Sequence, residues 1–423
     1  MISDDRRQPT TISDSVTHSA ATPNWWQRDD LAYDTGGRLR LAGQDLAHLA
    51  QSAGQPVFAY SARRLSENLD RLRQALRSIP HSSRILYAMK ANRFLPVLSH
   101  LKTAGIDGID VCSPEEIHLA RQVGFREDQI SFTGNSVSNA DLDCLAAHPG
   151  VWVNCDSLST IRRLAERSPG RKIGLRINPR VGVGYRQNEQ LRYAGDTATK
   201  FGIYADRMEE ALALADQVGL SVTGIHFHTG CGYLDDQLAN FRRVLEEALP
   251  FLRLVPHLEH INLGGGLGIP LAEGDAPLNL SAWSEVIGET LGSLAVAIWM
   301  EPGDYLVKDT GVMVLEINTI EEKGGRTFVG VTGGFNLHLE PAFYHLPLHM
   351  LPCCLSDDPG SQALPKATVV GNINEALDVF AEDIALPPVA EGDFLAFLNA
   401  GGYGTSMSSN HCMRGKFAEY LVV

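Results

Sequence analysis

The feature that most restricts how this chain can fold is a regular alternation of apolar runs and helical patterns between residues 85 and 300. Eight runs have the length and apolar content of buried strands. They occupy 85–89, 106–111, 130–133, 151–155, 172–177, 221–227, 259–263 and 297–300. Helical periodicity separates most of them, at 114–124, 157–168, 206–218, 236–254 and 281–295. This alternation predicts a parallel sheet, and eight units favour a closed (β/α)8 barrel over a doubly wound open sheet, which usually has fewer strands.

The segments outside this region have a different composition. Residues 1–25 are rich in Ser, Thr, Asp and Arg without periodicity, which predicts a disordered tail. Residues 26–55 hold short apolar fragments, and we expect them to pack with the last domain. The barrel is expected over 56–303, followed over 304–423 by an all-β domain of the sandwich or barrel type. Strand patterns in that last region occur at 312–320, 327–332, 367–370, 394–398 and 419–423.

Charge and composition argue against several classes of partner. The chain has 36 Lys and Arg against 50 Asp and Glu, a net charge of −14, and no basic stripe, so we expect neither nucleic acid nor a membrane surface. No apolar run approaches the roughly 20 residues that span a bilayer, and the polar N-terminus lacks the apolar core of a signal peptide. The seven cysteines are scattered without a CxxC pair, which indicates free thiols, a reducing cytoplasm and no metal site.

Four of the predicted strands end in groups that can carry chemistry. In a barrel, residues at the C-terminal strand ends face the active site. Lys90 follows the run 85–89, His228 follows 221–227, a glycine-rich stretch at 264–268 follows 259–263, and Glu301 follows 297–300. Taken singly, each has an ordinary explanation: a strand reaching the surface, a structural imidazole, a tight turn and a surface carboxylate.

Taken together, the four strand ends match one cofactor. They provide an amine for a Schiff base, a planar ring, backbone N–H groups for a phosphate and a carboxylate for a pyridine nitrogen. Pyridoxal 5′-phosphate requires these groups. We therefore predict a pyridoxal phosphate site at the mouth of the barrel. A barrel that binds only phosphate would leave Lys90 unexplained.

From about residue 56 to the C-terminus, the sequence resembles the fold-type-III pyridoxal phosphate decarboxylases, most of all the diaminopimelate decarboxylases, with ornithine decarboxylases as a further branch. The motifs that carry the resemblance lie in order at 87–92, 175–179, 200–203, 228–230, 264–268, 301–303, 375–378 and 400–404. The resemblance implies an amino-acid α-decarboxylase, a role in amino-acid metabolism such as lysine biosynthesis, and a homodimer whose active sites are shared between subunits.

The resemblance also implies individual roles. Lys90 forms the internal aldimine, His228 stacks on the cofactor ring, and Glu301 pairs with the pyridinium nitrogen. The other implied cofactor positions are Cys231, Gly264, Gly265, Gly266, Gly303 and Tyr403, the last closing over the phosphate. The implied substrate positions are Asp304, Glu340, Tyr344, Glu375 and Tyr403, with Glu375 entering from the partner subunit. Asn374 and Glu375 are implied to be catalytic.

Four positions depart from the family pattern. Cys231 replaces a phosphate-binding Ser, and a thiol is a weak donor. Asp304 and Glu340 replace two arginines that help to bind the distal carboxylate of diaminopimelate, which removes bidentate guanidinium–carboxylate binding. Asn374 replaces a Cys that controls protonation, and Asn cannot act as a general acid near neutral pH.

These departures predict a decarboxylase with an altered substrate, whose far end is cationic or neutral or which is a larger conjugate. An ornithine- or lysine-type decarboxylase and a racemase of the same fold are alternatives, as is a non-catalytic paralogue that binds the cofactor. Retention of Lys90, His228 and Glu301 argues against the paralogue. The sequence leaves open the substrate, its stereochemistry and the proton donor.

Overall fold

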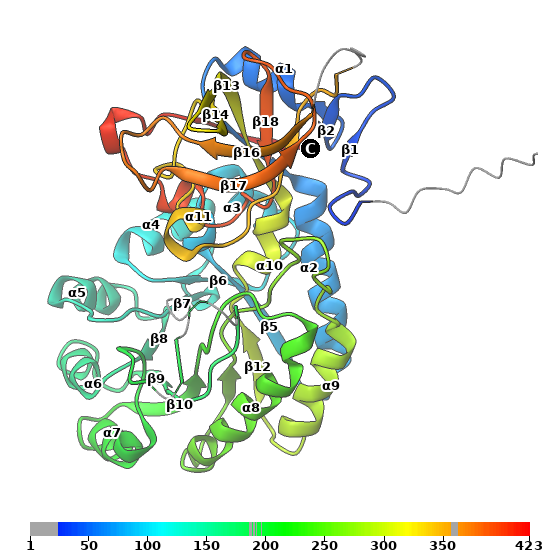
Figure 1. Cartoon of the computed structure of the whole chain (residues 1–423). Coiled ribbons are helices and arrows are strands. Elements are labelled where there is room, and N and C mark those ends of the chain that lie inside the picture. Colours follow the sequence, from blue (N-terminus) through cyan, green and yellow to red (C-terminus); the bar gives the residue numbers. More distant parts are fainter. Residues whose placement is uncertain (1–23, 186–187, 189–190, 192, 196, 357–362) are drawn as a thin grey trace, which may run out of the picture.

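The computed structural model of the chain describes residues 24–423 except 186–187, 189–190, 192, 196 and 357–362. The tail predicted at 1–25 therefore lies almost wholly outside the described residues. Figure 1 shows two bodies, a barrel surrounded by helices and a sheet domain packed against one end of it.

The barrel contains all eight predicted strands, each parallel to its neighbours. The strands are β5 (Ser83–Ala88), β6 (Gly108–Val111), β7 (Ile130–Phe132), β8 (Trp152–Cys155), β9 (Lys172–Arg176), β10 (Ser221–His226), β11 (His260–Asn262) and β12 (Ala297–Met300). They close in the order β10-β11-β12-β5-β6-β7-β8-β9. The predicted (β/α)8 barrel is confirmed, because every strand carries an apolar run that the closed sheet buries.

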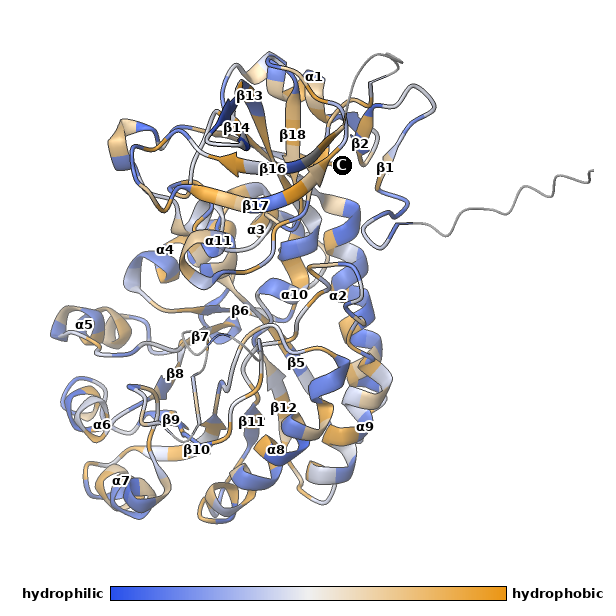
Figure 2. Cartoon of the chain, viewed as in Figure 1, coloured by the Kyte–Doolittle hydropathy of each residue, from blue (hydrophilic) through white to orange (hydrophobic). Residues whose placement is uncertain are grey.

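Helices cover the outside of the barrel, and Figure 2 shows hydrophobic and hydrophilic residues on each of them. They are α2 (Ala62–Arg77), α3 (Leu95–Thr103), α4 (Pro114–Val123), α5 (Asn139–Ala147), α6 (Leu158–Ala165), α7 (Ala205–Gln217), α8 (Leu238–Arg253) and α9 (Leu280–Leu291). The helix α2 begins directly after Ser61, which caps it: the Ser61 side chain accepts a hydrogen bond from the Arg64 N–H. Its apolar face, including Leu65, Leu69 and Leu72, is buried.

The second body is a mixed β domain, as predicted. Its strands are β4 (Val57–Ser61), β13 (Gly311–Lys323), β14 (Arg326–Val331), β15 (Met350–Pro352), β16 (Leu364–Val370), β17 (Val379–Leu386), β18 (Phe394–Phe397) and β19 (Ala418–Val422). The strand β4 precedes the first barrel helix, yet it pairs with β13 and β19 rather than with a barrel strand. Residues 57–61 therefore belong to the second sheet by hydrogen bonding.

The segment before β4 packs on this sheet domain. It forms the small sheet β1 (Leu31–Tyr33), β2 (Leu39–Leu41) and β3 (Gln44–Asp45), followed by the helix α1 (Leu46–Ala53). Its apolar side chains Trp26, Leu39 and Leu46 share a buried cluster with Val312 and Leu351 of the second sheet. Two short helices follow the barrel, α10 (Asp304–Val307) and α11 (Glu340–Tyr344), and α10 lies where the two bodies meet.

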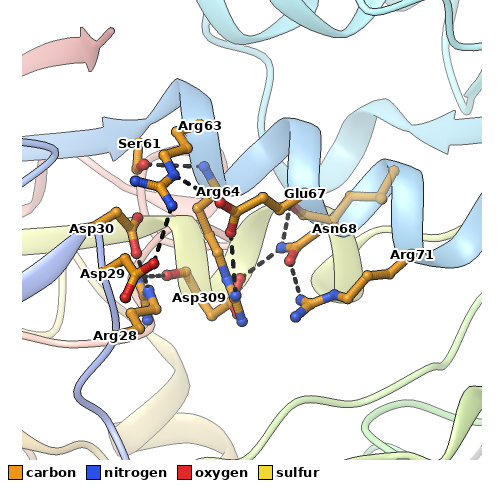
Figure 3. A network of polar contacts seen from close by, with 11 residues as sticks. Arg28, Asp29, Asp30, Ser61, Arg63, Arg64, Glu67, Asn68, Arg71 and Asp309 are labelled. Carbon is orange, nitrogen blue, oxygen red and sulfur yellow. Dashed lines mark hydrogen bonds and ion pairs between the residues drawn. The ribbon is translucent and has the colours of Figure 1, made fainter.

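A polar network joins the N-terminal segment, α2 and the turn after α10 (Figure 3). At its centre is the buried Asp309, whose Oδ2 accepts hydrogen bonds from Arg64 Nη2 at 2.6 Å and Nε at 2.9 Å. Asn68 Nδ2 donates to Asp309 Oδ1 at 2.7 Å, and Arg28 Nη2 donates to the Asp309 carbonyl at 2.5 Å. Burial acts to raise the pKa of Asp309, but the cations Arg64 and Arg28 outweigh it and lower that pKa below its usual value.

We expect Asp309→Ala to destabilise the protein by about 3 kcal/mol, because it leaves the half-buried Arg64 without its counter-ion. The measurement is the shift of the thermal unfolding midpoint. The matched control is Asp29→Ala, which removes an exposed partner of Arg63 and should cost less than about 1 kcal/mol. Since the Asp309 pKa is lower in the folded state, its stabilisation is present above about pH 4 and is lost as the pH falls through the folded pKa. Equal midpoints for both variants would contradict this role.

Within the described ranges, no helix combines the length and apolarity needed to cross a membrane. The same residues contain no group of three or more His, Cys, Asp or Glu placed to hold a metal ion. None of the seven cysteines, all of which are described, is in a disulfide bond.

Candidate active site

A pocket lies at the C-terminal ends of the barrel strands. Its lining includes nine of the residues singled out from the sequence: Lys90, His228, Cys231, Gly265, Gly266, Glu301, Gly303, Asp304 and Tyr403. Residues from four strand ends and from the β domain thus meet in one place, as the strand-end rule predicts.

Lys90 stands two residues beyond the end of β5, in the short 3-10 helix Met89–Ala91, and its side chain is exposed within the pocket. Burial of the site acts against the charged amine, but Cys112, Asp110 and Glu301 outweigh it and raise the pKa of Lys90. Burial also raises the pKa of the Cys112 thiol to about 12 and that of Asp110 well above its usual value. The Cys112 thiol is therefore neutral near pH 7, and Asp110 and Glu301 are the carboxyl groups that act on the Lys90 charge.

Glu301 follows β12 and is held by hydrogen bonds on both carboxylate oxygens. Asn262 Nδ2 donates to Oε1 at 2.6 Å, and His226 Nε2 lies 2.9 Å from Oε2. Asn262 in turn accepts the Gly264 N–H at 3.0 Å, which connects Glu301 to the glycine stretch. Burial acts to raise the pKa of Glu301, but His226, Lys90 and Asn262 lower it overall, so the carboxylate is ionised at neutral pH.

His228 lies two residues beyond β10 and presents a neutral ring. Burial, followed by the nearby Lys90 and Arg176 charges, lowers its pKa well below the usual value. The Gly265 N–H donates to its Nδ1 at 3.3 Å, so the ring proton resides on Nε2, which faces Cys231 Sγ at 3.8 Å. Tyr193, from the long segment between β9 and β10, meets the ring edge-on at a centroid distance of 4.5 Å.

The glycine stretch fits close approach of a ligand to the backbone. Gly264 and Gly266 have φ values of 68° and 99°, which favour glycine. A Cβ atom at Gly265 would lie 2.3 Å from the Glu301 carbonyl oxygen, and one at Gly266 would lie 2.4 Å from that of Gly230. Side chains are therefore excluded where two strand-end loops meet. Together with Lys90 and the ionised Glu301, this chemistry fits pyridoxal phosphate.

Four residues that the sequence analysis did not single out line the pocket or support the groups that do. Arg176 and His226, at the ends of β9 and β10, line the pocket. Asn262 ends β11 and positions Glu301, while Asp110 of β6 lies close enough to act on the Lys90 charge. The same rule that found Lys90 would have found all four, since each stands within a residue or two of a strand's C-terminal end.

The two acids that replace family arginines are tied to a buried cation. Lys308 is 2% exposed, and its Nζ donates to Glu340 at 2.7 Å to Oε1 and 2.5 Å to Oε2. It also lies 3.6 Å from Asp304 Oδ2. Burial acts to lower the pKa of Lys308, but Asp304 and Glu340 raise it overall. Because Lys308 neutralises one of the two acids, the local charge is less negative than the sequence alone indicated.

Five of the predicted site residues do not line this pocket in the single chain. Gly264 and Glu340 lie behind the residues that line the pocket. The Gly264 N–H donates to Asn262, and the Glu340 carboxylate accepts from Lys308. Tyr344 lines a neighbouring cavity. Asn374 and Glu375 are exposed in the turn before β17, where Glu375 Oε1 lies 3.3 Å from His411 Nε2.

The fold and the pocket fit one class of protein, a barrel enzyme that binds a phosphorylated cofactor at the ends of its strands. The sequence model of the pyridoxal-dependent decarboxylases, described as their pyridoxal-binding domain, matches residues 63–308. The diaminopimelate decarboxylase of Methanothermobacter thermautotrophicus is 36% identical over 93% of this chain and 92% of its own. The chain therefore belongs to the pyridoxal-dependent decarboxylase family, and it is a carboxy-lyase that uses pyridoxal phosphate.

Solved structures agree with this assignment. The diaminopimelate decarboxylase of M. jannaschii, solved in complex with L-lysine, has a TM-score of 0.83 and 25% identity, covering 93% of each chain. An arginine decarboxylase of Paramecium bursaria Chlorella virus has a TM-score of 0.77 at 19% identity, covering 89% of this chain and 98% of its own, and shares the fold.

Proposed function

We propose that this protein is an amino-acid α-decarboxylase whose Lys90 holds the cofactor and whose substrate differs from diaminopimelate at its far end. The observation that carries the first part is the meeting of Lys90, His228 and the ionised Glu301 with the glycine stretch in one pocket. When bound, pyridoxal phosphate supplies the electron sink for loss of CO2.

The residues of the chain then have distinct tasks. Lys90 Nζ would hold the cofactor at its aldehyde carbon until the substrate amine takes its place. Glu301, fixed by Asn262 and His226, would keep a proton on the ring nitrogen. The neutral His228 would lie against the ring without adding a charge beside it. The glycine stretch would hold the phosphate through backbone N–H groups. With Asn374 in place of Cys, the proton that replaces CO2 would come from Lys90, water or a group of the partner subunit, because the lowered pKa of His228 leaves it without an acidic proton near neutral pH.

The substrate proposal rests on the absence of a suitable cation. Along the described pocket lining, the cations are Lys90 and Arg176, and Arg176 lies close enough to Glu301 and Asp110 for both to act on its charge. Lys308 is bound on two sides by Glu340. A distal carboxylate therefore finds no free guanidinium among these residues, and a cationic or neutral far end is favoured.

We also propose that the active site is completed by a second copy of the chain, in the cytoplasm. The turn that holds Asn374 and Glu375 is exposed, and the adjacent Leu377 is 46% exposed although it is a large apolar side chain. An exposed apolar residue beside two predicted catalytic residues is expected at an interface. Sedimentation of the holoenzyme tests this, because a monomer at assay concentration would contradict it.

The second candidate is diaminopimelate decarboxylation itself, which would place the chain in lysine biosynthesis. The observation that favours it is the 36% identity to the relative from Methanothermobacter, which bears that name. The two candidates differ in what the distal pocket accepts, so one assay separates them.

The test is CO2 release by the holoenzyme from meso-diaminopimelate and from lysine, ornithine and arginine in both enantiomers, at saturating cofactor. We expect release from one or more cationic amino acids and at least tenfold lower kcat/KM for diaminopimelate, since a bidentate charge-assisted contact is missing. Preferred release from diaminopimelate would overturn the substrate proposal and keep the decarboxylase. Inversion without CO2 release would indicate a racemase, and the absence of any reaction would leave a conjugate substrate or a non-catalytic protein.

A further inference from the structure

Asp304 occupies an unexpected position for an acid. It follows Gly303 beyond β12, the eighth strand of the barrel, and it lines the pocket beside Gly265 and Gly266, which follow the seventh strand, β11. In barrels of this class, the loops after the seventh and eighth strands are the usual place for a cofactor or substrate phosphate. Gly232, from the loop after β10, completes this side of the pocket. A carboxyl group therefore stands where a phosphate is expected.

The hydrogen-bonding state of Asp304 is incomplete. Its Oδ2 forms the 3.6 Å ion pair with Lys308, while its Oδ1 is buried and has no hydrogen-bond partner among the described residues. The backbone of Gly402 packs closely against Oδ1, and only glycine allows this approach, because a Cβ atom at Gly402 would lie 2.7 Å from Oδ1. A buried oxygen without a partner costs free energy unless a ligand supplies one. Because Asp304 lines the pocket, a group bound there could supply the partner that Oδ1 lacks.

The surroundings of Asp304 disfavour its ionised form. Burial raises the pKa of Asp304 to about 6; Lys308 opposes this shift and the Glu340 carboxylate adds to it. The cation Lys308 is already engaged by both Glu340 oxygens. The other titratable groups that face Asp304 stay neutral near pH 7, because their own pKa values are raised. They are Tyr87, Tyr185, Cys231 and Tyr403.

A phosphate bound at the glycine stretch would further disfavour the ionised form of Asp304. The phosphate of the cofactor carries close to two negative charges at pH 7. An ionised carboxylate beside it would repel it with little solvent screening, whereas a carboxylic acid can donate a hydrogen bond to it. The same oxygen that lacks a partner can carry the proton that this contact needs.

We propose that Asp304 binds the cofactor phosphate as the neutral carboxylic acid, with Oδ1–H donating to a phosphate oxygen. The proposal rests on the phosphate lying at the glycine stretch, and it does not depend on which amino acid is decarboxylated. Asp304 would thus be a cofactor-binding residue that makes affinity depend on pH, rather than a contact to the far end of the substrate.

The direction of the pH dependence follows from linkage. If the phosphate binds only the acid form, the pKa of Asp304 is higher in the complex than in the cofactor-free protein, so binding takes up a proton. Affinity is then constant below about pH 6 and falls as the pH rises, by up to about tenfold per unit. The fall ends at the pKa that Asp304 has in the complex.

The test is the dissociation constant of pyridoxal phosphate, measured by absorption between pH 5.5 and 8.5, for wild type, Asp304→Asn and the near-isosteric Asp304→Leu. We expect Asn, which keeps a donor without a charge, to match wild type at pH 5.5 and to bind at least about tenfold more tightly at pH 8. Leu, which has no donor, should bind more weakly than Asn throughout. Pyridoxal, which lacks the phosphate but attaches to the same lysine, should show no difference between wild type and Asn.

Proton uptake gives an independent measurement on the unaltered protein. Calorimetry at pH 8 in buffers of different ionisation enthalpy should show close to one more proton taken up with pyridoxal phosphate than with pyridoxal, because attachment to Lys90 is common to both. Equal proton uptake with the two ligands, or parallel pH profiles for wild type and Asp304→Asn, would overturn the proposal. So would an equal difference between these two proteins with pyridoxal. CO2 release and borohydride fixation at Lys90 test the proposed function separately. Their results do not decide whether Asp304 binds the phosphate.

Discussion

Lys90→Ala is expected to abolish covalent attachment of pyridoxal phosphate and to lower kcat/KM by on the order of 10³-fold or more. Along the described lining, Lys90 is the one primary amine, since Lys308 is buried and bound by Glu340. The variant therefore loses the group that attaches the cofactor and one of the candidate proton donors. The fold should survive, because the Lys90 side chain is exposed within the pocket and contributes little packing.

The measurement is the absorption spectrum before and after borohydride, with mass spectrometry of the fixed peptide. Wild type should retain one cofactor per chain on the peptide that contains Lys90, and the variant none. The matched control is Lys172→Ala, which removes an exposed lysine paired with Glu259 at the opposite end of the barrel. Its spectrum and turnover should be unchanged. Borohydride fixation of equal cofactor in Lys90→Ala would refute the role of this residue.

The barrel and most of its site could be predicted because both depend on local sequence. Each strand carries its own apolar run, and each strand end fixes the direction of the next side chain. Lys90, His228 and Glu301 are far apart along the chain, yet a closed sheet brings all strand ends to one face. Position relative to a strand was therefore sufficient to group them.

The parts that could not be predicted depend on contacts between distant segments. Lys308 lies in a short 3-10 turn with no motif, and its partner Glu340 is 32 residues further on. The negative charge assigned to Asp304 and Glu340 was overestimated because this cation was missing from the argument. The strand β4 was similarly assigned by its place before the barrel, although its hydrogen bonds run to β13 and β19. The pattern of apolar residues in a strand predicts which of its faces is buried, but it does not predict which strands pair with it.

The roles of Asn374 and Glu375 show a different limit. A single chain leaves both exposed, in a turn outside the pocket. Their catalytic role remains a prediction that requires a second subunit, and neither spacing nor burial within one chain bears on it. A distance between chains is fixed by an interface, which a single sequence indicates only weakly.

Glu301→Gln is expected to keep the cofactor but to lower kcat by on the order of 10²-fold or more, as removal of one group that stabilises developing charge does in other enzymes. The change keeps the shape of the side chain, and the site can absorb its new amide. His226 Nδ1 has no hydrogen-bond partner among the described residues. The imidazole proton can therefore move from Nε2 to Nδ1, which lets Nε2 accept a hydrogen bond from the Gln amide. Asn262 can still donate to the remaining oxygen.

The loss in Glu301→Gln should come from the charge alone. A neutral amide cannot hold a proton on the ring nitrogen, so the cofactor accepts electrons less well while its attachment to Lys90 is kept. The measurement is kcat at saturating cofactor, with cofactor content determined on the same sample. The control is Glu116→Gln, a nearby acid that accepts the Cys112 N–H and does not line the pocket. A similar loss in both variants would mean that the general negative charge near Lys90 matters, whereas a loss confined to Glu301→Gln assigns the effect to its contact with the ring.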